Sequence, residues 1–312
     1  MKMTINIALL GTGRIAEVGY IPAIQQISDT NIISVLSRNE ARGKAFAQKH
    51  QIKNSYVDLD ELLRDKSLDA VIICTPDAMH EEQVIKSCRA NKHILCEKPM
   101  STDYQSCLKM IEEIKKSKII FGMAYNNRFN AGLRYIKEQI EKDQIGNIYY
   151  ARAMLSTQQN DPEGWRALGN QSKFWAMSAT GTHMIDIFRW YFGEPTDTKM
   201  ISLSPKYRSP NDEISTLTMN FNNKILCDVT ASAILPRVNR IEVYSDTDVI
   251  IGENVFGIKT DEEIYHNNKK ILIEPISSFF GEVLDFTNSI IKNRSPRSTF
   301  EDGIKNLMIM QS

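Results

Sequence analysis

The sequence has little of what marks a metal-binding, disulfide-stabilised or polyanion-binding protein. Its five histidines include no pair spaced i, i+4, and its five cysteines include no C-x-x-C. Zinc sites and disulfide frameworks depend on such spacings, so we expect no metal and a reducing compartment. Lysine plus arginine equals aspartate plus glutamate, 38 each. The chain therefore has no net positive charge that would favour nucleic acid as a partner.

Long apolar runs are also lacking. No segment approaches the length that spans a bilayer, and Met1-Lys2 leads directly into a strand pattern without a signal peptide. We therefore expect a cytoplasmic protein with no membrane partner. The 312 residues, 42% hydrophobic and 24% charged, suffice for two domains with sizeable cores.

A glycine-rich turn follows the first apolar run, residues 4–10. It matches G-x-G-x-x-A and lies between a predicted strand and a predicted helix over 14–27. The first glycine permits the tight turn, the second lets the backbone approach a pyrophosphate, and the alanine lets the helix lie close to the strand. This context predicts a dinucleotide site formed by Gly11-Thr12-Gly13-Arg14-Ile15-Ala16.

The second predicted strand, 31–36, ends in Ser37-Arg38. NAD-binding sites usually place an acidic residue here for the ribose 2′-hydroxyl. A hydroxyl and a guanidinium suit a 2′-phosphate instead, because arginine pairs with phosphate through charge-assisted hydrogen bonds. We predict NADP(H) in preference to NAD(H), which stays possible. The alternative is that Arg38 only starts a solvated helix.

Strand and helix patterns alternate as far as residue 123. Helices are predicted over 40–49, 59–64 and 78–90 and from an N-cap at Ser101 to 115; strands are predicted over 55–57, 68–74, 94–96 and 118–123. The run over 68–74 is continuously apolar, as in a strand covered on both faces. The alternation predicts an α/β domain, a doubly wound parallel (Rossmann) sheet, over residues 1–122.

Two further strands of this sheet end in polar residues. One is followed by Thr75-Pro76-Asp77-Ala78-Met79-His80 and the other by Glu97-Lys98-Pro99. Ligands bind at the carboxyl edge of such sheets. Pro99 restricts Lys98 to an extended backbone, and a lysine so held could exchange a proton if its surroundings lower its pKa. The alternative is an ordinary solvated lysine at a strand end.

These motifs, with Asn127-Arg128-Phe129 and Gly181-Thr182-His183-Met184-Ile185-Asp186, resemble those of the Gfo/Idh/MocA oxidoreductases. The tail, from Phe280-Gly281-Glu282 to Glu301-Asp302-Gly303, is also similar, so the resemblance covers nearly the whole chain. It implies a C-terminal α+β domain, residues 123–312, built on a large, mostly antiparallel open sheet. That domain is expected to bind substrate and to form a homodimer or homotetramer through the sheet.

The resemblance also implies residue roles. Catalysis would fall to Lys98, with His183 beside it. The cofactor would be lined or held by Thr75, Pro76, His80, Glu97 and Asn127, and the substrate would be faced by Arg128 and His183; a non-standard peptide bond often precedes Pro99. The family commonly has an aspartate four positions before this histidine, where this chain has Ala179. Either Asp186 or the substrate then orients the imidazole, or proton transfer rests on Lys98 and His183 alone.

The second half also has patterns of its own. A polar loop over 156–173 contains Trp165-Arg166, which either covers a ligand or anchors the loop on the core. The helix over 179–190 places His183 and Asp186 on one face, and we count Trp165 and Asp186 among the substrate-binding candidates. Strand patterns at 148–155, 200–203, 214–221, 224–231, 237–245 and 248–251 predict one meandering sheet; helices are expected over 129–141, 278–292 and 301–310.

The function we expect is hydride transfer between nicotinamide C4 and the carbinol or carbonyl carbon of a sugar, sugar derivative or cyclitol, with Lys98 and His183 exchanging the proton. Two alternatives stay open. One is a glycosidase of the same fold that uses the dinucleotide for a transient oxidation. The other is a non-enzymatic regulator that senses a dinucleotide, which the Ala179 departure leaves open and the presence of Lys98 and His183 together argues against.

Overall fold

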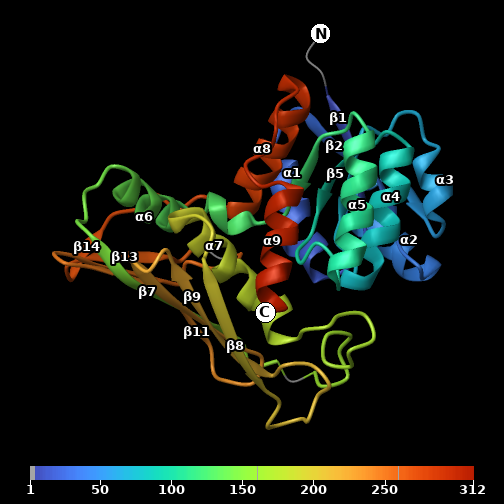
Figure 1. The fold of residues 1–312 in the computed structure, drawn as a ribbon. Helices are drawn as coiled ribbons and strands as arrows, with labels where there is room; N and C mark the ends of the chain where they lie inside the picture. Colours follow the sequence, from blue (N-terminus) through green and yellow to red (C-terminus); the bar gives the residue numbers. More distant parts are fainter. Residues whose placement is uncertain (1–3, 160, 259) are drawn as a thin grey trace. The chain divides into compact units, whose positions relative to one another are not determined.

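The computed structural model describes residues 4–159, 161–258 and 260–312, which form two compact units (Figure 1). Unit 1 contains the residues up to Ala124 and Phe279–Ile304, and unit 2 contains Tyr125–Ser278 and Lys305–Ser312. The predicted division at residue 122 therefore differs from the observed one in the tail. The tail returns to unit 1 because its apolar side chains pack there: Phe286 lies against Gly122.

Six parallel strands form the sheet of unit 1, in the order β3-β2-β1-β4-β5-β6. In the central strands almost every side chain is buried, as the continuous apolar runs predicted. The order reverses beside β1, which confirms the doubly wound sheet. The strands are β1 (Ile5–Leu10), β2 (Thr30–Leu36), β3 (Asn54–Tyr56), β4 (Ala70–Ile73), β5 (His93–Cys96) and β6 (Phe121–Met123).

Helices flank this sheet; Figure 1 shows α4 and α5 side by side on one face and α8 on the other. The predicted N-cap at Ser101 is wrong: α5 begins at Tyr104, and the carboxylate of Asp103 accepts the Ser106 N–H at 3.0 Å. A carboxylate next to the positive helix N-terminus is the stronger cap. The helices of unit 1 are η1 (Ala16–Tyr20, a π-helical turn), α1 (Ile21–Gln25), α2 (Glu40–Lys49), α3 (Leu59–Leu63), η2 (Asp77–Met79, 3₁₀), α4 (His80–Arg89), α5 (Tyr104–Lys116), α8 (Ser278–Lys292) and the start of α9 (Phe300–Met310).

Eight strands form the sheet of unit 2, in the order β14-β13-β12-β11-β7-β10-β9-β8. Only β10 and β7 pair in parallel within this described sheet, so the prediction of a large, mostly antiparallel sheet is confirmed. The last two strands were not predicted; the two-residue turn Asn267-Asn268, both at positive φ, joins them. The strands are β7 (Ile148–Ser156), β8 (Asp197–Leu203), β9 (Ile214–Phe221), β10 (Ile225–Ser232), β11 (Val238–Ser245), β12 (Val249–Glu253), β13 (Glu263–His266) and β14 (Lys269–Ile271).

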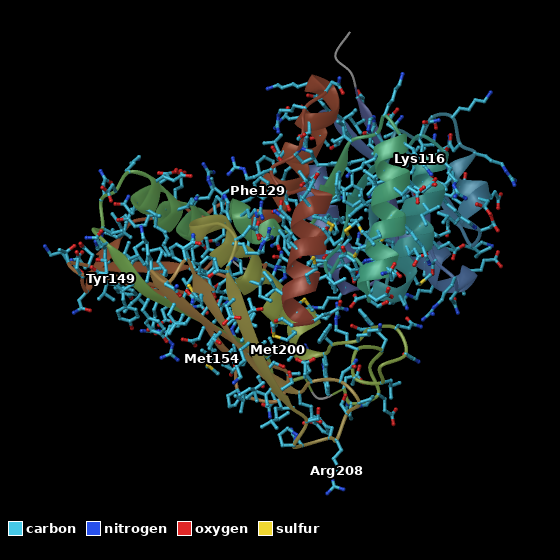
Figure 2. The ribbon with its side chains drawn as sticks, viewed as in Figure 1. Lys116, Phe129, Tyr149, Met154, Met200 and Arg208 are labelled. Carbon is cyan, nitrogen blue, oxygen red and sulfur yellow. The ribbon has the colours of Figure 1, made fainter. Side chains whose placement is uncertain are left out.

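One face of this sheet carries α6 (Ala131–Glu141) and α7 (Thr182–Phe192) (Figure 1). Along the strands, buried side chains on that face alternate with more exposed ones on the other. Met200 packs into the core under the helices, whereas Met154 lies on the opposite, open face (Figure 2). Two short helical turns, η3 (Asn126–Phe129, 3₁₀) and η4 (Met177–Gly181, π), precede α6 and α7. In the part of the chain described here, no helix has both the length and the apolar character needed to cross a membrane.

Candidate active site

The glycine-rich turn leaves β1 as predicted. Gly11 has φ +119°, and a Cβ on it would lie 2.9 Å from the Cys74 carbonyl oxygen, so only glycine fits. A Cβ on Gly13 would meet nothing within 4 Å, which leaves the backbone open to an approaching group. Ala16 is fully buried where the next element packs on the sheet. Arg14 is exposed and Ile15 half-buried.

At the end of β2 the structure assembles a small polar cluster. Ser37 is buried, and the Thr12 hydroxyl lies 3.5 Å from its Oγ. Arg38 is exposed. Sequence reasoning missed Arg42, whose Nε donates to Thr12 Oγ1 at 2.8 Å and whose Nη2 donates to the Thr12 carbonyl at 3.0 Å. The available signal was a second arginine in the first turn of α2, close behind Ser37 and Arg38.

The motif after β4 is tied to the motif after β5 by a histidine. His80 is fully buried, with Nε2 3.0 Å from the Thr75 carbonyl oxygen and Nδ1 3.0 Å from that of Pro99. The Thr75 hydroxyl donates to Gln83 Oε1 at 2.6 Å. Pro76 is half-buried. His80 thus holds together two strand-end loops, a role that requires no contact to ligand.

Lys98 is only 8% exposed at the carboxyl end of β5. The alternative of a solvated strand-end lysine does not fit this burial. The Lys98-Pro99 peptide bond is cis, in line with the resemblance. Glu97 is buried as well, and both its oxygens are engaged inside unit 1: Oε1 accepts the Tyr20 hydroxyl at 2.8 Å and Oε2 accepts the Lys98 backbone N–H at 3.1 Å. Sequence reasoning missed Tyr20.

Two residues predicted to contact substrate pair with each other in unit 2. Arg128 donates from Nε and Nη2 to the two carboxylate oxygens of Asp186, at 2.8 and 2.6 Å, and both side chains are buried. Asn306 also donates to Asp186, at 3.1 Å. Two opposite charges removed from water need such a bidentate arrangement. The geometry therefore gives their predicted substrate contacts no support.

Asn127 and His183 both belong to unit 2, and their surroundings differ. Asn127 is 1% exposed; its Oδ1 accepts the Gly257 N–H at 3.1 Å, and its Nδ2 has no hydrogen-bond partner among the described residues. A buried amide nitrogen without a hydrogen-bond partner is a candidate donor to a ligand. His183 is half-buried and meets Tyr125 edge to face, with ring centroids 6.5 Å apart. Ala179 lies in η4.

The long loop of unit 2 is anchored by a segment that sequence reasoning missed. Asp212 accepts the backbone N–H groups of Trp175 at 2.7 Å and Met177 at 2.9 Å, and its burial raises its pKa. Trp165 is half-buried with the Arg166 guanidinium stacked 3.9 Å from its ring centroid. Arg166 Nε also donates to Ser178 Oγ in η4 at 3.3 Å, and this link to the core supports the self-anchoring alternative for Trp165.

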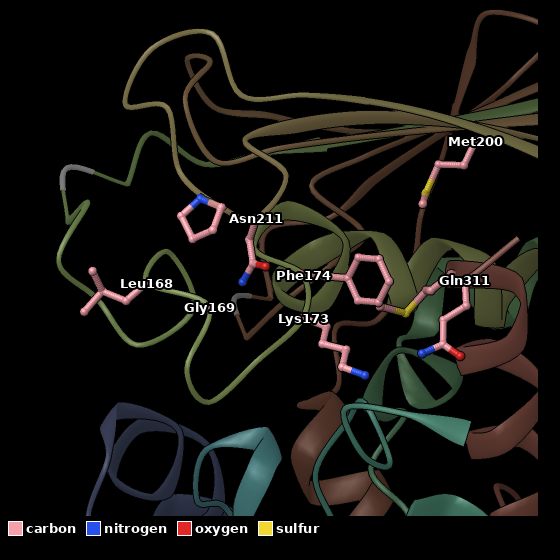
Figure 3. Close-up of a pocket in the computed structure, with 9 residues that line it drawn as sticks. Leu168, Gly169, Lys173, Phe174, Met200, Asn211 and Gln311 are labelled. Carbon is pink, nitrogen blue, oxygen red and sulfur yellow. The ribbon is translucent and has the colours of Figure 1, made fainter. Parts of the chain in front are cut away.

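A cavity of about 480 Å³ lies beside this loop in unit 2. Figure 3 shows Phe174, Met200 and Gln311 grouped on one side of it, with Leu168 on the other. None of the predicted site residues lines it. Within the described ranges, no group of three or more histidine, cysteine, aspartate or glutamate side chains is arranged to hold a metal ion.

In short, unit 1 brings together the three predicted strand-end motifs: the glycine turn, Thr75 to His80, and Glu97 to Pro99. Unit 2 contains Asn127, Arg128, His183, Asp186 and Trp165, and it brings Arg128 and Asp186 into direct contact. Lys98 and His183 belong to different units.

Known proteins resemble this chain over its whole length. Myo-inositol 2-dehydrogenase of Thermotoga maritima is 25% identical over 97% of this chain and 93% of its own, and the scyllo-inositol 2-dehydrogenase (NADP(+)) of Bacillus subtilis is 24% identical over 98% and 95%. A structure of levoglucosan dehydrogenase in complex with NADH superposes with a TM-score of 0.89 at 20% identity, covering 99% of this chain and 95% of that one. This likeness shows the same fold.

Two family models match the chain. Residues 5–125 match the model of an oxidoreductase family with an NAD-binding Rossmann fold, and residues 133–251 match that of the GFO/IDH/MocA C-terminal domain. The two matches together span most of the chain. They agree with the parallel sheet of unit 1, the open sheet of unit 2 and the motifs on both, and the protein therefore belongs to the Gfo/Idh/MocA family of oxidoreductases.

Proposed function

We propose that this protein is an NADP(H)-dependent oxidoreductase that transfers a hydride between nicotinamide C4 and a carbinol or carbonyl carbon of a sugar, sugar derivative or cyclitol. The observation that carries the proposal is the burial of Lys98 at the same carboxyl edge of the sheet as the glycine turn. A lysine is rarely buried, and this edge is where ligands of such sheets bind. The names of the inositol and levoglucosan dehydrogenases support the substrate class.

The residues fit a dinucleotide. The open side of Gly13 leaves room for a pyrophosphate at the turn, and the free Nδ2 of Asn127 is suited to donate a hydrogen bond. When bound, the nicotinamide ring gives or takes the hydride. Thr75 and Pro76 would line it, and His80 would fix the two loops that face it.

The chain's own part is to position the substrate and to move one proton. Lys98 would exchange the proton of the substrate hydroxyl, and His183 would act as its partner or as the alternative acid/base. Ala179 provides no carboxylate to orient His183, and Asp186 has its oxygens engaged by Arg128 and Asn306. Proton transfer then rests on Lys98 and His183.

The preference for NADP(H) is supported by the cluster at the end of β2. Ser37 and Arg38 are the proposed 2′-phosphate ligands, and Arg42 holds the neighbouring turn through Thr12. No carboxylate occurs between Leu36 and Glu40 to repel the phosphate. NAD(H) binding stays possible.

We also propose self-association through the open face of the unit 2 sheet, as a homodimer or homotetramer. Ile201, Leu203 and Leu226 on its strands are more than half exposed. They lie on the same face of the sheet, where a second copy of the chain could cover them. Light scattering after size-exclusion chromatography should give a multimer for the natural chain and a monomer for Leu203→Glu. A cytoplasmic location stays a prediction.

The test of the proposal is a thermal-shift comparison of NADPH with NADH, followed by a panel of sugars and polyols read at the nicotinamide absorbance. NADPH should stabilise the protein more than NADH, and at least one polyol should reduce NADP⁺. Stabilisation by neither dinucleotide contradicts the proposal. Tight binding without any turnover would favour a dinucleotide-sensing regulator, and hydrolysis of a chromogenic glycoside would favour the glycosidase.

A further inference from the structure

Thr75, which opens the polar motif after β4, has a backbone that is fixed at two points. It precedes Pro76, which restricts Thr75 to an extended conformation. Its carbonyl oxygen lies 3.0 Å from Nε2 of His80, a fully buried side chain. Thr75 itself is half-buried. With the backbone held in this way, the freedom that Thr75 keeps is the rotation of its side chain about χ1.

The two branches of the Thr75 side chain face different groups. The hydroxyl donates to Oε1 of Gln83 at 2.6 Å. The methyl carbon faces the glycine turn, because it is the Thr75 atom nearest to the position of a Cβ on Gly11, at 3.4 Å. Each of the other two staggered rotamers would take the methyl group away from the turn and put a hydrogen or the hydroxyl there. The bond to Gln83 therefore selects the rotamer that presents the methyl group to Gly11.

Gln83 stands behind Thr75 on α4, three residues after His80. It is 2% exposed, and its Nε2 has no hydrogen-bond partner among the described residues. A buried amide nitrogen without a partner costs stability, and a methionine of similar length would fill the same space without that cost. The amide is therefore better explained by its bond to Thr75 than by packing. Exchanging the amide oxygen and nitrogen would leave Gln83 bonded to the same hydroxyl, so the rotamer of Thr75 does not depend on which of the two atoms faces it.

We propose that Gln83 is a positioning residue for the dinucleotide: it sets the side chain of Thr75 so that the methyl group, and not the hydroxyl, faces the glycine turn. The inference rests on the proposed function, because that function brings the dinucleotide to this turn. Gln83 is buried and acts through Thr75, whose half-buried side chain supplies an apolar contact to the ligand. The proposed 2′-phosphate ligands lie at the end of β2 instead, so binding of NADPH and of NADH should depend on Gln83 equally.

Dissociation constants for NADPH and NADH, from the fluorescence of the reduced nicotinamide, test the proposal without turnover. Gln83→Met releases the rotamer, so about a third of the molecules keep the methyl group at the turn and both Kd values should rise about threefold. Gln83→Met/Thr75→Val should bind more tightly than Gln83→Met, because valine places methyl groups toward both neighbours. Ser87→Ala is the control and should leave both Kd values unchanged. Ser87 is fully buried one turn further along α4, and its hydroxyl also has no partner in the described part of the chain.

Single substitutions of Thr75 separate the methyl group from the hydroxyl. Thr75→Ser keeps the bond to Gln83 and loses the methyl group, whose contact is worth about fourfold in affinity. Thr75→Val keeps the methyl group but leaves the buried amide without its partner, so its urea midpoint should fall. Thr75→Ser should therefore bind both dinucleotides more weakly than Thr75→Val. The reverse order would mean that the hydroxyl contacts the dinucleotide, and it overturns the inference. So does an unchanged Kd in Gln83→Met, or a double variant that binds no more tightly.

A measurement on the ligand-free protein distinguishes failure of this inference from failure of the proposed function. The three-bond NMR couplings from the Thr75 methyl carbon to the backbone nitrogen and carbonyl carbon report χ1. They should give one rotamer in the natural protein and an average over several in Gln83→Met. If neither dinucleotide bound, the proposed function would fail while the couplings still reported on the bond between Gln83 and Thr75. If both bound and the couplings were the same in the two proteins, the function would stand and the positioning role of Gln83 would fall.

Discussion

Two buried lysines flank the same strand of unit 1, and their surroundings differ. Lys92 precedes β5 and Lys98 follows it by two residues, and each is 8% exposed. The ammonium of Lys92 donates to the carbonyl oxygens of Asp65 and Leu68, at 2.8 Å each, where it closes the turn before β4. Lys98 stands at the opposite end, between the buried carboxylate of Glu97 and a cis proline.

The difference teaches that burial of a lysine does not by itself indicate function. Burial lowers the pKa of Lys92, with the charges of Asp65 and Asp69 acting against it. Lys92 could thus be mistaken for a perturbed catalytic group, yet its bonds are those of a structural cap at the amino edge. The direction of the parallel strands distinguishes the two lysines, because ligands bind at the carboxyl edge of such sheets.

The largest expected effect tests this comparison directly. Lys98→Met should lower kcat by about 10²–10⁴-fold, the range for loss of a general acid or base, with little change in unfolding. Lys92→Met should leave the buried Leu68 carbonyl group without its donor and lower the free energy of unfolding by about 1–3 kcal/mol, with kcat per folded molecule unchanged. Steady-state kinetics and urea unfolding of both variants measure the two quantities. An equal loss of activity in the two variants would contradict the different roles given to Lys98 and Lys92.

The second prediction extends the comparison to unit 2, where the buried pair Arg128–Asp186 has the bonds of a structural group. Arg128→Met leaves the Asp186 carboxylate buried without its main partner and should lower the free energy of unfolding by about 3–5 kcal/mol. The double variant Arg128→Met/Asp186→Leu should recover most of that loss. Urea unfolding of the single and double variants measures both free energies. A single variant of normal stability with a raised KM for the polyol would instead restore Arg128 to the substrate site.

The sequence predicts the sheet-edge residues of unit 1 because strand periodicity and motif spacing act over a few residues. Gly11, Thr75 and Lys98 lie where a parallel sheet puts its carboxyl ends, and the structure agrees. The partners that complete these groups come from far along the chain. Tyr20 meets Glu97 across 77 residues and Arg128 meets Asp186 across 58. No local pattern encodes such pairs, so Tyr20 was missed and Arg128 was assigned to substrate.

The same limit explains the errors in the fold. Strands β13 and β14 were missed because they are three or four residues long and contain charged side chains, which leaves too few apolar positions for an alternation. The return of the tail to unit 1 was missed because helix periodicity gives an apolar face but not the surface that covers it. Here that surface includes Gly122 and Tyr20, on which Phe286 and Phe279 pack.

A third prediction sharpens the carboxyl-edge argument at β2. Arg38→Ala should raise KM for NADPH about tenfold and leave KM for NADH unchanged, because only NADPH has the 2′-phosphate. Arg42→Ala removes two hydrogen bonds to Thr12 in the glycine turn, so both KM values should rise by similar factors. Initial rates with each dinucleotide separate the two arginines. If KM for NADPH barely changes in Arg38→Ala, the assignment of the 2′-phosphate site to Arg38 is wrong.

The smallest expected effect concerns a half-exposed ion pair at the end of α7, in contrast to the buried pair within it. Hydrogen bonds from Arg189 to both oxygens of Glu194, at 2.9 and 2.6 Å, lower the pKa of that carboxyl to about 2, against a weaker effect of burial. A folded-state pKa below the unfolded value of about 4.3 means that the pair stabilises the protein above that pH and ceases to do so as pH falls towards 2. Since solvent screens the exposed carboxylate, the contribution should be about 1 kcal/mol or less.

Glu194→Gln should therefore unfold at lower temperature than the natural protein near neutral pH, and the difference should shrink as the pH approaches about 3. An equal unfolding temperature for the two proteins at every pH would mean that Arg189 is held by Asn306 alone, through the bond at 2.8 Å that survives the substitution.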